Sequence, residues 1–288
     1  MSDPQDEPTH RHAHYLHRPK TLEHLVALPV PNPRVFDWTS ELRVATADGG
    51  IWRVETDGGS APWGMGLPEP VAMASREGQL AQVARDGRMR IWAGTEPMAE
   101  LSLGLISQVL LLPTATGWVL SGDDADGQRQ LRVVDHEGGT RVRAWLPPKT
   151  IVAVAHEGQP FLARSLAGGL WRGPIGEPVP EEEPSSHILR APGPDRIVGL
   201  GHGGVFFADA EQRWNLRAVD TSAMAWGAGD LAVLGTRRGE LAAFHLGSRE
   251  RLRYVSGHRG PVMAITPSPK GNLLVSAGSD GCRLWALA

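Results

Sequence analysis

Residues Asn272–Trp285 read NLLVSAGSDGCRLW. The stretch contains a short apolar run, a polar turn that includes Gly281, and a second short run that ends in tryptophan. Both runs are too short for a stable helix, and the glycine supplies the positive φ that a tight hairpin turn requires. The stretch therefore predicts two antiparallel β-strands joined by a tight turn.

The same unit recurs six more times along the chain. The other copies are LRVATADGGIWRV (42–54), LAQVARDGRMRIW (80–92), WVLSGDDADGQRQLRVV (118–134), FLARSLAGGLWRG (161–173), RIVGLGHGGVFFAD (196–209) and LAVLGTRRGELAAF (231–244). Successive turn glycines are 35 to 42 residues apart, at Gly49, Gly87, Gly127, Gly168, Gly203, Gly239 and Gly281. This period matches the length of one blade of a β-propeller.

A further short apolar run precedes most of these hairpins. We interpret these runs as innermost strands, at Val35–Trp38, Val71–Ala74, Val109–Leu112, Ile151–Val154 and Val262–Ile265. Arg251–Val255 lies between two units and is interpreted as a fourth, outer strand. Four strands per unit predict an all-β fold, a seven-bladed β-propeller of four-stranded antiparallel blades. The starts of these innermost strands show no repeated polar position that would build a channel mouth of three or more convergent acids or histidines, as a central-channel enzyme would need.

The two ends of the chain are expected to meet in one blade. The sequence stops three residues after Trp285, so the last blade has no outer strand of its own. Thr21–Val30, an alternating apolar run, is predicted to complete that blade and close the ring, because closure removes exposed sheet edges. Residues 1–19 are assigned to a flexible His-rich tail and residues 20–288 to the propeller. The proline-rich acidic stretch Gly173–His187 is predicted to be a surface loop of the fourth blade.

The composition is that of a soluble globular protein, since 41% of the 288 residues are hydrophobic and 21% are charged. A net charge of −3 gives no overall attraction for nucleic acid or an anionic membrane, so neither is expected as a partner. The single cysteine, Cys282, cannot form an internal disulfide, and the N-terminal residues lack the apolar segment of a secretion signal. A cytoplasmic protein is predicted.

The last unit, SGHRGPVMAITPSPKGNLLVSAGSDGCRLW (256–285), resembles the WD-repeat family. Gly257 and His258 match the Gly-His pair of that family, and its serine, aspartate and tryptophan are matched by Ser276, Asp280 and Trp285. The resemblance implies that His258, Ser276, Asp280 and Trp285 form a hydrogen-bonded chain that ties the blade together. Such a buried polar chain is tolerable when every member has a partner. The first two units keep part of the pattern, at Asp48, Gly49 and Trp52 and at Asp86, Gly87 and Trp92.

Three groups of polar residues are candidate binding sites. A basic surface on the sixth and seventh blades is predicted from Arg237, Arg238, Arg249, Arg251, Arg253 and Arg259. This surface could bind an acidic partner or phosphate, although arginine on outer strands also discourages edge pairing. The tail residues His10, His12, His14 and His17 could chelate a transition metal, and Asp123, Asp124 and Asp126 could hold calcium. A solvated tail and an ordinary hairpin turn are the favoured interpretations, so no metal or cofactor is expected.

Trp38, Trp226 and Cys282 are interpreted as packing residues. The two tryptophans occupy equivalent places in innermost strands where other units carry aliphatic residues, which favours packing between blades. Cys282 lies beside the last hairpin turn, and nothing in the sequence indicates a lowered thiol pKa.

The predicted function is recognition without catalysis. No nucleophile elbow, phosphate-binding glycine loop or zinc-binding histidine pair is found, so we expect no enzymatic activity. Loops on a stiff frame suit binding, and the WD-repeat resemblance implies a scaffold or recognition subunit that holds partner proteins through its blade loops. A composition rich in Ala, Arg, Gly and Leu indicates a bacterial source, where such proteins accompany effectors. The alternatives are a propeller enzyme with a central-channel site, such as a lactonase-like hydrolase, and phosphate or nucleic-acid binding by the arginines.

Overall fold

The computed structural model describes residues 22–114, 116–146, 150–154, 161–165, 170–172, 177–179, 186–193, 196–201, 204–208, 213–216, 220–227, 231–245 and 250–287. For residues 108, 141–216, 226 and 250–253 it describes the backbone only. Within these ranges the chain forms 28 β-strands joined by turns. None of the described segments is a helix with the length and hydropathy that a membrane crossing requires.

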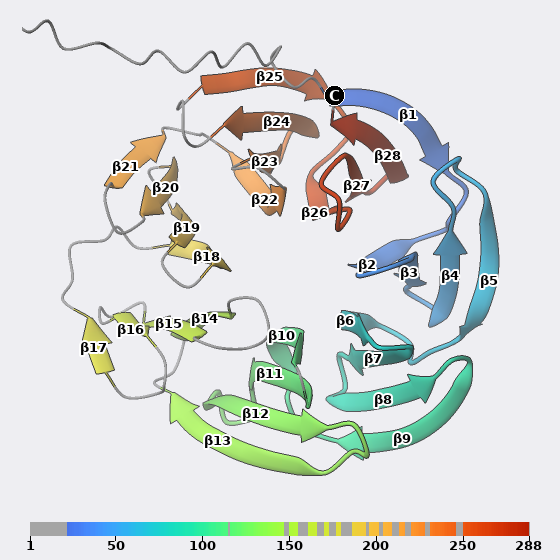
Figure 1. Ribbon diagram of the computed structural model, residues 1–288, viewed down its shortest axis with the longest axis vertical. Helices are drawn as coiled ribbons and strands as arrows, with labels where there is room; N and C mark the ends of the chain where they lie inside the picture. Colours follow the sequence, from blue (N-terminus) through green and yellow to red (C-terminus); the bar gives the residue numbers. More distant parts are fainter. Residues whose placement is uncertain are drawn as a thin grey trace, which may run out of the picture.

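The described strands form seven four-stranded antiparallel sheets arranged around a common centre (Figure 1). The first strand is innermost in six of these sheets, and β26 (Val262–Pro267) is innermost in the seventh. The first two sheets contain β2 (Pro33–Trp38), β3 (Leu42–Thr46), β4 (Gly50–Val54) and β5 (Ser60–Met65), then β6 (Pro70–Arg76), β7 (Gln79–Ala84), β8 (Arg88–Ala93) and β9 (Glu96–Ser102). The third and fourth contain β10 (Ser107–Thr114), β11 (Gly117–Asp123), β12 (Arg129–Asp135) and β13 (Thr140–Leu146), then β14 (Thr150–Val154), β15 (Phe161–Ser165), β16 (Leu170–Arg172) and β17 (Glu177–Val179). The fifth and sixth contain β18 (Ser186–Gly193), β19 (Arg196–Gly201), β20 (Gly204–Ala208) and β21 (Arg213–Leu216), then β22 (Thr221–Gly227), β23 (Leu231–Thr236), β24 (Glu240–His245) and β25 (Glu250–Ser256).

The seventh sheet joins the two ends of the described chain. It contains β26 (Val262–Pro267), β27 (Leu273–Gly278) and β28 (Gly281–Leu287), and its outermost strand is β1 (Leu22–Leu28). The pairing of β1 with β28 runs from Leu22 opposite Leu287 to Leu28 opposite Cys282. The segment predicted to complete the last blade therefore contains the strand that does so.

Each of the seven hairpins predicted from the sequence is present, as the second and third strands of a sheet. The prediction of a long surface loop at Gly173–His187 was wrong in part, because β17 lies within it and pairs with β16. This strand carries Pro178 opposite Trp171. A proline is tolerated on an edge strand because its missing N–H faces away from the sheet. The acidic, proline-rich sequence is typical of a loop, so it did not predict this strand.

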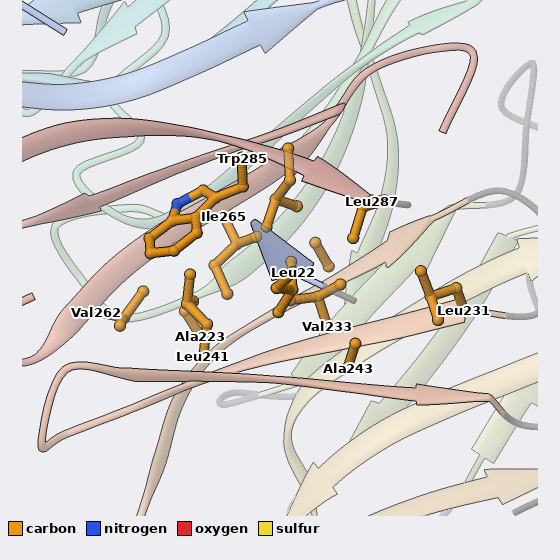
Figure 2. Packing of buried hydrophobic residues seen from close by; sticks show 12 residues of the cluster. Leu22, Ala223, Leu231, Val233, Leu241, Ala243, Val262, Ile265, Trp285 and Leu287 are labelled. Atoms are coloured by element: carbon orange, nitrogen blue, oxygen red, sulfur yellow. The ribbon is translucent and has the colours of Figure 1, made fainter. Parts of the chain in front are cut away.

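The hydrophobic core consists of the seams between neighbouring sheets. The second strands are the most deeply buried, since every residue of β11 and β23 is buried, whereas no residue of the outer strands β5 and β9 is buried. One cluster between the sixth and seventh sheets includes Val233, Leu241 and Trp285 together with Leu22 and Leu287 of the terminal strands (Figure 2). Apolar area buried in such seams is the main stabilising contribution to folding, at roughly 25 cal/mol per Å².

Prolines protect the outer edges of several sheets. In three of them the tryptophan of the third strand pairs with a proline of the fourth, in the pairs Trp52–Pro62, Trp92–Pro97 and Trp171–Pro178. In the seventh sheet the partner of Trp285 is His24, whose ring meets the indole edge-on at 5.1 Å. Because proline offers no N–H to a further strand, these edges are blunted against edge-to-edge association.

The innermost strands of all seven sheets begin at the same end of the sheets, and we call this end the entry face. In an antiparallel order this end also carries the turns between second and third strands. The entry-face loops of neighbouring sheets are joined by backbone hydrogen bonds, from Glu69 N to Ala47 O at 2.9 Å and from His258 N to Gly239 O at 2.8 Å. The loops are therefore held by the frame as well as by their own turns.

Candidate functional site

The four residues singled out in the last unit form one chain of side-chain hydrogen bonds, which is buried except at Asp280. The indole Nε1 of Trp285 donates to Ser276 Oγ at 2.8 Å, and Ser276 Oγ lies 2.7 Å from His258 Nε2. On the other side of the imidazole, Nδ1 lies 2.6 Å from Asp280 Oδ1. Ser276, Trp285 and His258 are almost completely buried. The chain connects the loop before β26 to the hairpin of β27 and β28.

Hydrogen-bond chemistry fixes the protons along this chain. The ionised carboxylate of Asp280 can only accept, so Nδ1 of His258 carries a proton and donates it to Asp280. In the neutral imidazole Nε2 then carries no proton and accepts from the hydroxyl of Ser276, whose oxygen accepts from the indole N–H. Burial lowers the pKa of His258 and outweighs the opposing hydrogen bond and charge of Asp280. This shift favours the neutral form that the chain requires.

Asp280 links the chain to the entry face. Burial raises the pKa of its carboxyl, but hydrogen bonds from His258 and from the backbone N–H of Arg259, together with nearby charges, lower it overall. The second oxygen accepts from Arg259 N at 3.1 Å and from Arg283 at 2.7 Å. A methyl group on Gly278 would lie 2.6 Å from the imidazole, so the glycine makes room for the ring.

In the second sheet, a hydrogen bond between a side chain and the backbone takes the place of these side-chain hydrogen bonds. Gln82 stands four residues before Asp86, as Ser276 stands four residues before Asp280, and it is fully buried. Its Oε1 accepts from the backbone N–H of Leu67 at 2.6 Å, in the loop before β6. Asp86 instead accepts from the backbone and side chain of Arg88. No sequence pattern predicts this contact, because its donor is a main-chain amide and not a histidine side chain.

A second buried polar group joins the first and second sheets near the ends of their innermost strands. Asp37 of β2 accepts hydrogen bonds from the backbone N–H and the hydroxyl of Ser75 in β6, and from the hydroxyl of Thr39 at 3.0 Å. Burial raises the pKa of Asp37, and these hydrogen bonds oppose the effect. The guanidinium of Arg43 lies 3.8 Å away. No sequence pattern pointed to this group, because its partners are 38 residues apart.

The aspartates considered for calcium are engaged within the third sheet. Asp123 forms a buried two-point ion pair with Arg129 across β11 and β12, at 2.5 and 2.8 Å. Asp124 caps the turn, accepting from the backbone N–H groups of Asp126 and Gln128 and from the side chain of Gln130. In the portion of the chain that the structure describes, no group of three or more His, Cys, Asp or Glu residues is arranged to hold a metal.

The predicted basic surface is divided by the fold. Arg237 and Arg238 lie in the turn between β23 and β24, and Arg259 lies in the adjoining loop before β26, so these three share the entry face. Arg251 and Arg253 are residues of β25, paired with Phe244 and Ala243 farther down the outer edge. Arg249 and the tail histidines His10, His12, His14 and His17 lie outside the described residues.

Among the described residues, three that directly precede innermost strands are polar, although only two of these are acids and none is a histidine. Asn32, Glu69 and Asp220 directly precede β2, β6 and β22, and all three have positive φ, at 42°, 50° and 66°. Each carbonyl accepts a backbone N–H from the following hairpin turn, as Glu69 O does from Arg85 N at 2.9 Å. The two carboxylates each face an arginine, with Glu69 3.9 Å from Arg85 and Asp220 3.6 Å from Arg238.

Trp38 packs partly buried against the core between the first and seventh sheets. Trp226 stands at the equivalent sixth position of β22, where the backbone alone is described. Cys282 is buried, and burial raises the pKa of its thiol to about 12. A thiol of this kind is almost entirely un-ionised at neutral pH and therefore unreactive.

Comparison with family models gives no match, and comparison with curated proteins gives none either. Among solved structures, the chain is similar to the computationally designed Ika8 protein, with a TM-score of 0.67 and 16% identity over 92% of this chain and 99% of that chain. At this identity the likeness concerns the fold alone, and it supports a β-rich, propeller-like architecture.

Proposed function

We propose that this protein is a non-catalytic scaffold or recognition subunit that binds one or more partner proteins through loops of its entry face. The observation that carries the proposal is the arrangement of these loops on a stiff frame. Loops of neighbouring sheets are tied by backbone hydrogen bonds, yet they display charged side chains such as Arg237 and Arg85 to solvent. Binding residues are commonly carried by loops that a rigid scaffold positions.

The proposed architecture is a closed ring of seven blades, completed by β1 in the last blade. The pairing of β1 with β28 supports closure, because it joins the first described strand to the last. The hydrogen-bonded chain of His258, Ser276, Asp280 and Trp285 supports the proposal that the chain is a divergent WD-repeat protein. A cytoplasmic, bacterial protein that serves an effector complex is part of the same proposal.

Site-directed photo-cross-linking in extract of the cells that make the protein tests this function. A photo-reactive amino acid is introduced at Ser279 or Asp126, both exposed in entry-face turns, or at Glu55 or Glu77 at the opposite end of the sheets. We expect the entry-face positions to capture the same protein in stoichiometric amounts and the opposite positions to capture none of it. The proposal is overturned if the two sets capture that protein equally, or if neither set captures a protein.

A further inference from the structure

The described arginines differ sharply in whether their charge is compensated. A carboxylate lies within 4 Å of the guanidinium groups of Arg43, Arg53, Arg76, Arg85, Arg88, Arg90, Arg129, Arg238 and Arg283. Arg132 donates instead to the side-chain oxygen of Gln130. Among arginines whose side chains are described, Arg34, Arg237 and Arg259 have neither kind of partner, and all three are exposed.

These three arginines lie on consecutive sheets at the entry face. Arg237 is in the turn that precedes β24 of the sixth sheet, and Arg259 is in the loop that leads into the seventh. The two segments touch, since Gly257 N and His258 N both donate to Gly239 O at 2.8 Å. Arg34 is the second residue of β2, which lies beside β26.

An exposed apolar side chain stands in the middle of this series. Met263 is the second residue of β26, the position that Arg34 occupies in β2, and the two strands begin with the same burial pattern. Met263 is 47% exposed, although it belongs to an innermost strand. We define the arginine arc as Arg34, Arg237, Arg259 and Met263. A flexible thioether between unpaired guanidinium groups offers both an apolar contact and charge.

We propose that the arginine arc binds an acidic segment of a partner protein, whose carboxylates meet Arg34, Arg237 and Arg259 and whose apolar side chain covers Met263. This proposal rests on the proposed function and names the chemistry of the partner. Charge complementarity selects an anionic ligand, because no described carboxylate neutralises these groups. Guanidinium groups also bind carboxylates through two parallel hydrogen bonds, which gives direction as well as charge.

Local acidic groups argue for a peptide over a nucleic acid. Asp220, Glu69 and Asp86 lie exposed on the same face, and the whole chain carries a net charge of −3. Polynucleotides need a continuous series of cationic contacts along the phosphate backbone. An acidic segment can place single carboxylates on single guanidinium groups and keep apolar residues elsewhere, so it suits three separate cations around Met263.

Fluorescence anisotropy with a labelled glutamate-rich dodecapeptide that contains one central leucine tests the proposal. The charge-reversal variant R237E/R259E is compared with R53E/K270E, which changes the net charge equally at two exposed cations near the opposite end of the sheets. We expect R237E/R259E to weaken peptide binding at least about tenfold, since each exposed charge pair contributes a fraction of the affinity, and R53E/K270E to change it less than about twofold. R237Q/R259Q, which adds no repulsion, is expected to lose binding to a smaller extent.

Further measurements test the apolar contact with Met263 and distinguish an acidic peptide from other anionic ligands. M263A should weaken binding of the leucine peptide more than binding of the same peptide with alanine in place of leucine. The proposal is overturned if both charge-reversal variants lose binding equally, if no peptide binds, or if a thymidine dodecanucleotide or vesicles of phosphatidylglycerol bind more tightly than the peptide. If photo-cross-linking at Ser279 still captures a partner with R237E/R259E at the wild-type yield, the arc proposal fails while the proposed function stands. If the peptide binds at the arc but no entry-face position captures a protein, the proposed function fails.

Discussion

Removal of the Ser276 hydroxyl tests the buried hydrogen-bonded chain most directly. Ser276→Ala leaves the indole N–H of Trp285 without an acceptor and the Nε2 of His258 without a donor, and both groups are almost completely buried. A buried polar group that loses its only partner costs roughly 1–3 kcal/mol. With two groups orphaned, we expect the free energy of unfolding to fall by about 2–6 kcal/mol, measured by urea denaturation followed by circular dichroism.

The structure offers a matched control for the same chemical change. Ser121 is buried in β11, a second strand like β27, and its hydroxyl has no hydrogen-bond partner among the described residues. Because Ser121→Ala removes an unpaired polar atom and orphans nothing, we expect a change between zero and a stabilisation of about 1 kcal/mol. A loss below about 1 kcal/mol in Ser276→Ala, or an equal loss in the two variants, would refute the reasoning.

A double-mutant cycle locates the interaction. Trp285→Phe removes the indole donor, so in this background Ser276→Ala orphans His258 alone. We expect the double variant to be more stable than the sum of the single effects predicts, by about 1 kcal/mol, because the two residues share a hydrogen bond. Additive effects would place the cost of Ser276→Ala elsewhere.

Three further substitutions follow from the buried polar groups. Burial lowers the pKa of His258 below its ordinary 6.5, so the unfolded chain binds a proton more readily than the folded chain. The free energy of unfolding should therefore fall as the pH decreases below about 6.5. The urea midpoint of His258→Gln should fall less over the same pH range. Asp37→Ala orphans two donors of Ser75 and should cost about 1–3 kcal/mol in urea denaturation, against about 0.5 kcal/mol or less for the exposed Asp57→Ala. Arg129→Met leaves the buried Asp123 uncompensated and should cost about 3–5 kcal/mol by the same measurement, and most of that loss should be regained in Asp123→Leu/Arg129→Met.

The hairpins could be predicted from the sequence because each needs a backbone feature that one residue type supplies. Gly49, Gly87 and Gly239 have φ of 95°, 82° and 85° in their turns, a conformation that favours glycine. Short apolar runs on both sides then define the strands. The outer strands lack such a marker. Their exposed residues alternate weakly, and β17 carries a proline, so the pattern that identifies a buried strand is absent there.

The polar contacts were predictable only where side chains bind side chains. His258, Ser276, Asp280 and Trp285 carry recognisable letters at fixed spacing, whereas Gln82 binds a main-chain amide that every residue except proline offers. The same backbone conformation, with positive φ before an innermost strand, is also adopted by different residue types. Asn32 and Glu69 share the pattern of an aliphatic residue, proline, a polar residue and proline, at 30–33 and 67–70, while Asp220 adopts positive φ in the sequence AVDT.

Two adjacent arginines show why charge patterns underdetermine a binding surface. Arg237 and Arg238 occupy one exposed turn and look equivalent in the sequence. Asp220, held before β22 by its backbone, lies 3.6 Å from Arg238, whereas Arg237 has no carboxylate neighbour among the described residues. A partner that binds Arg238 must displace or share this carboxylate, while a partner that binds Arg237 gives up only water. The availability of a charge is thus decided by a residue 18 positions away, which only the fold brings near.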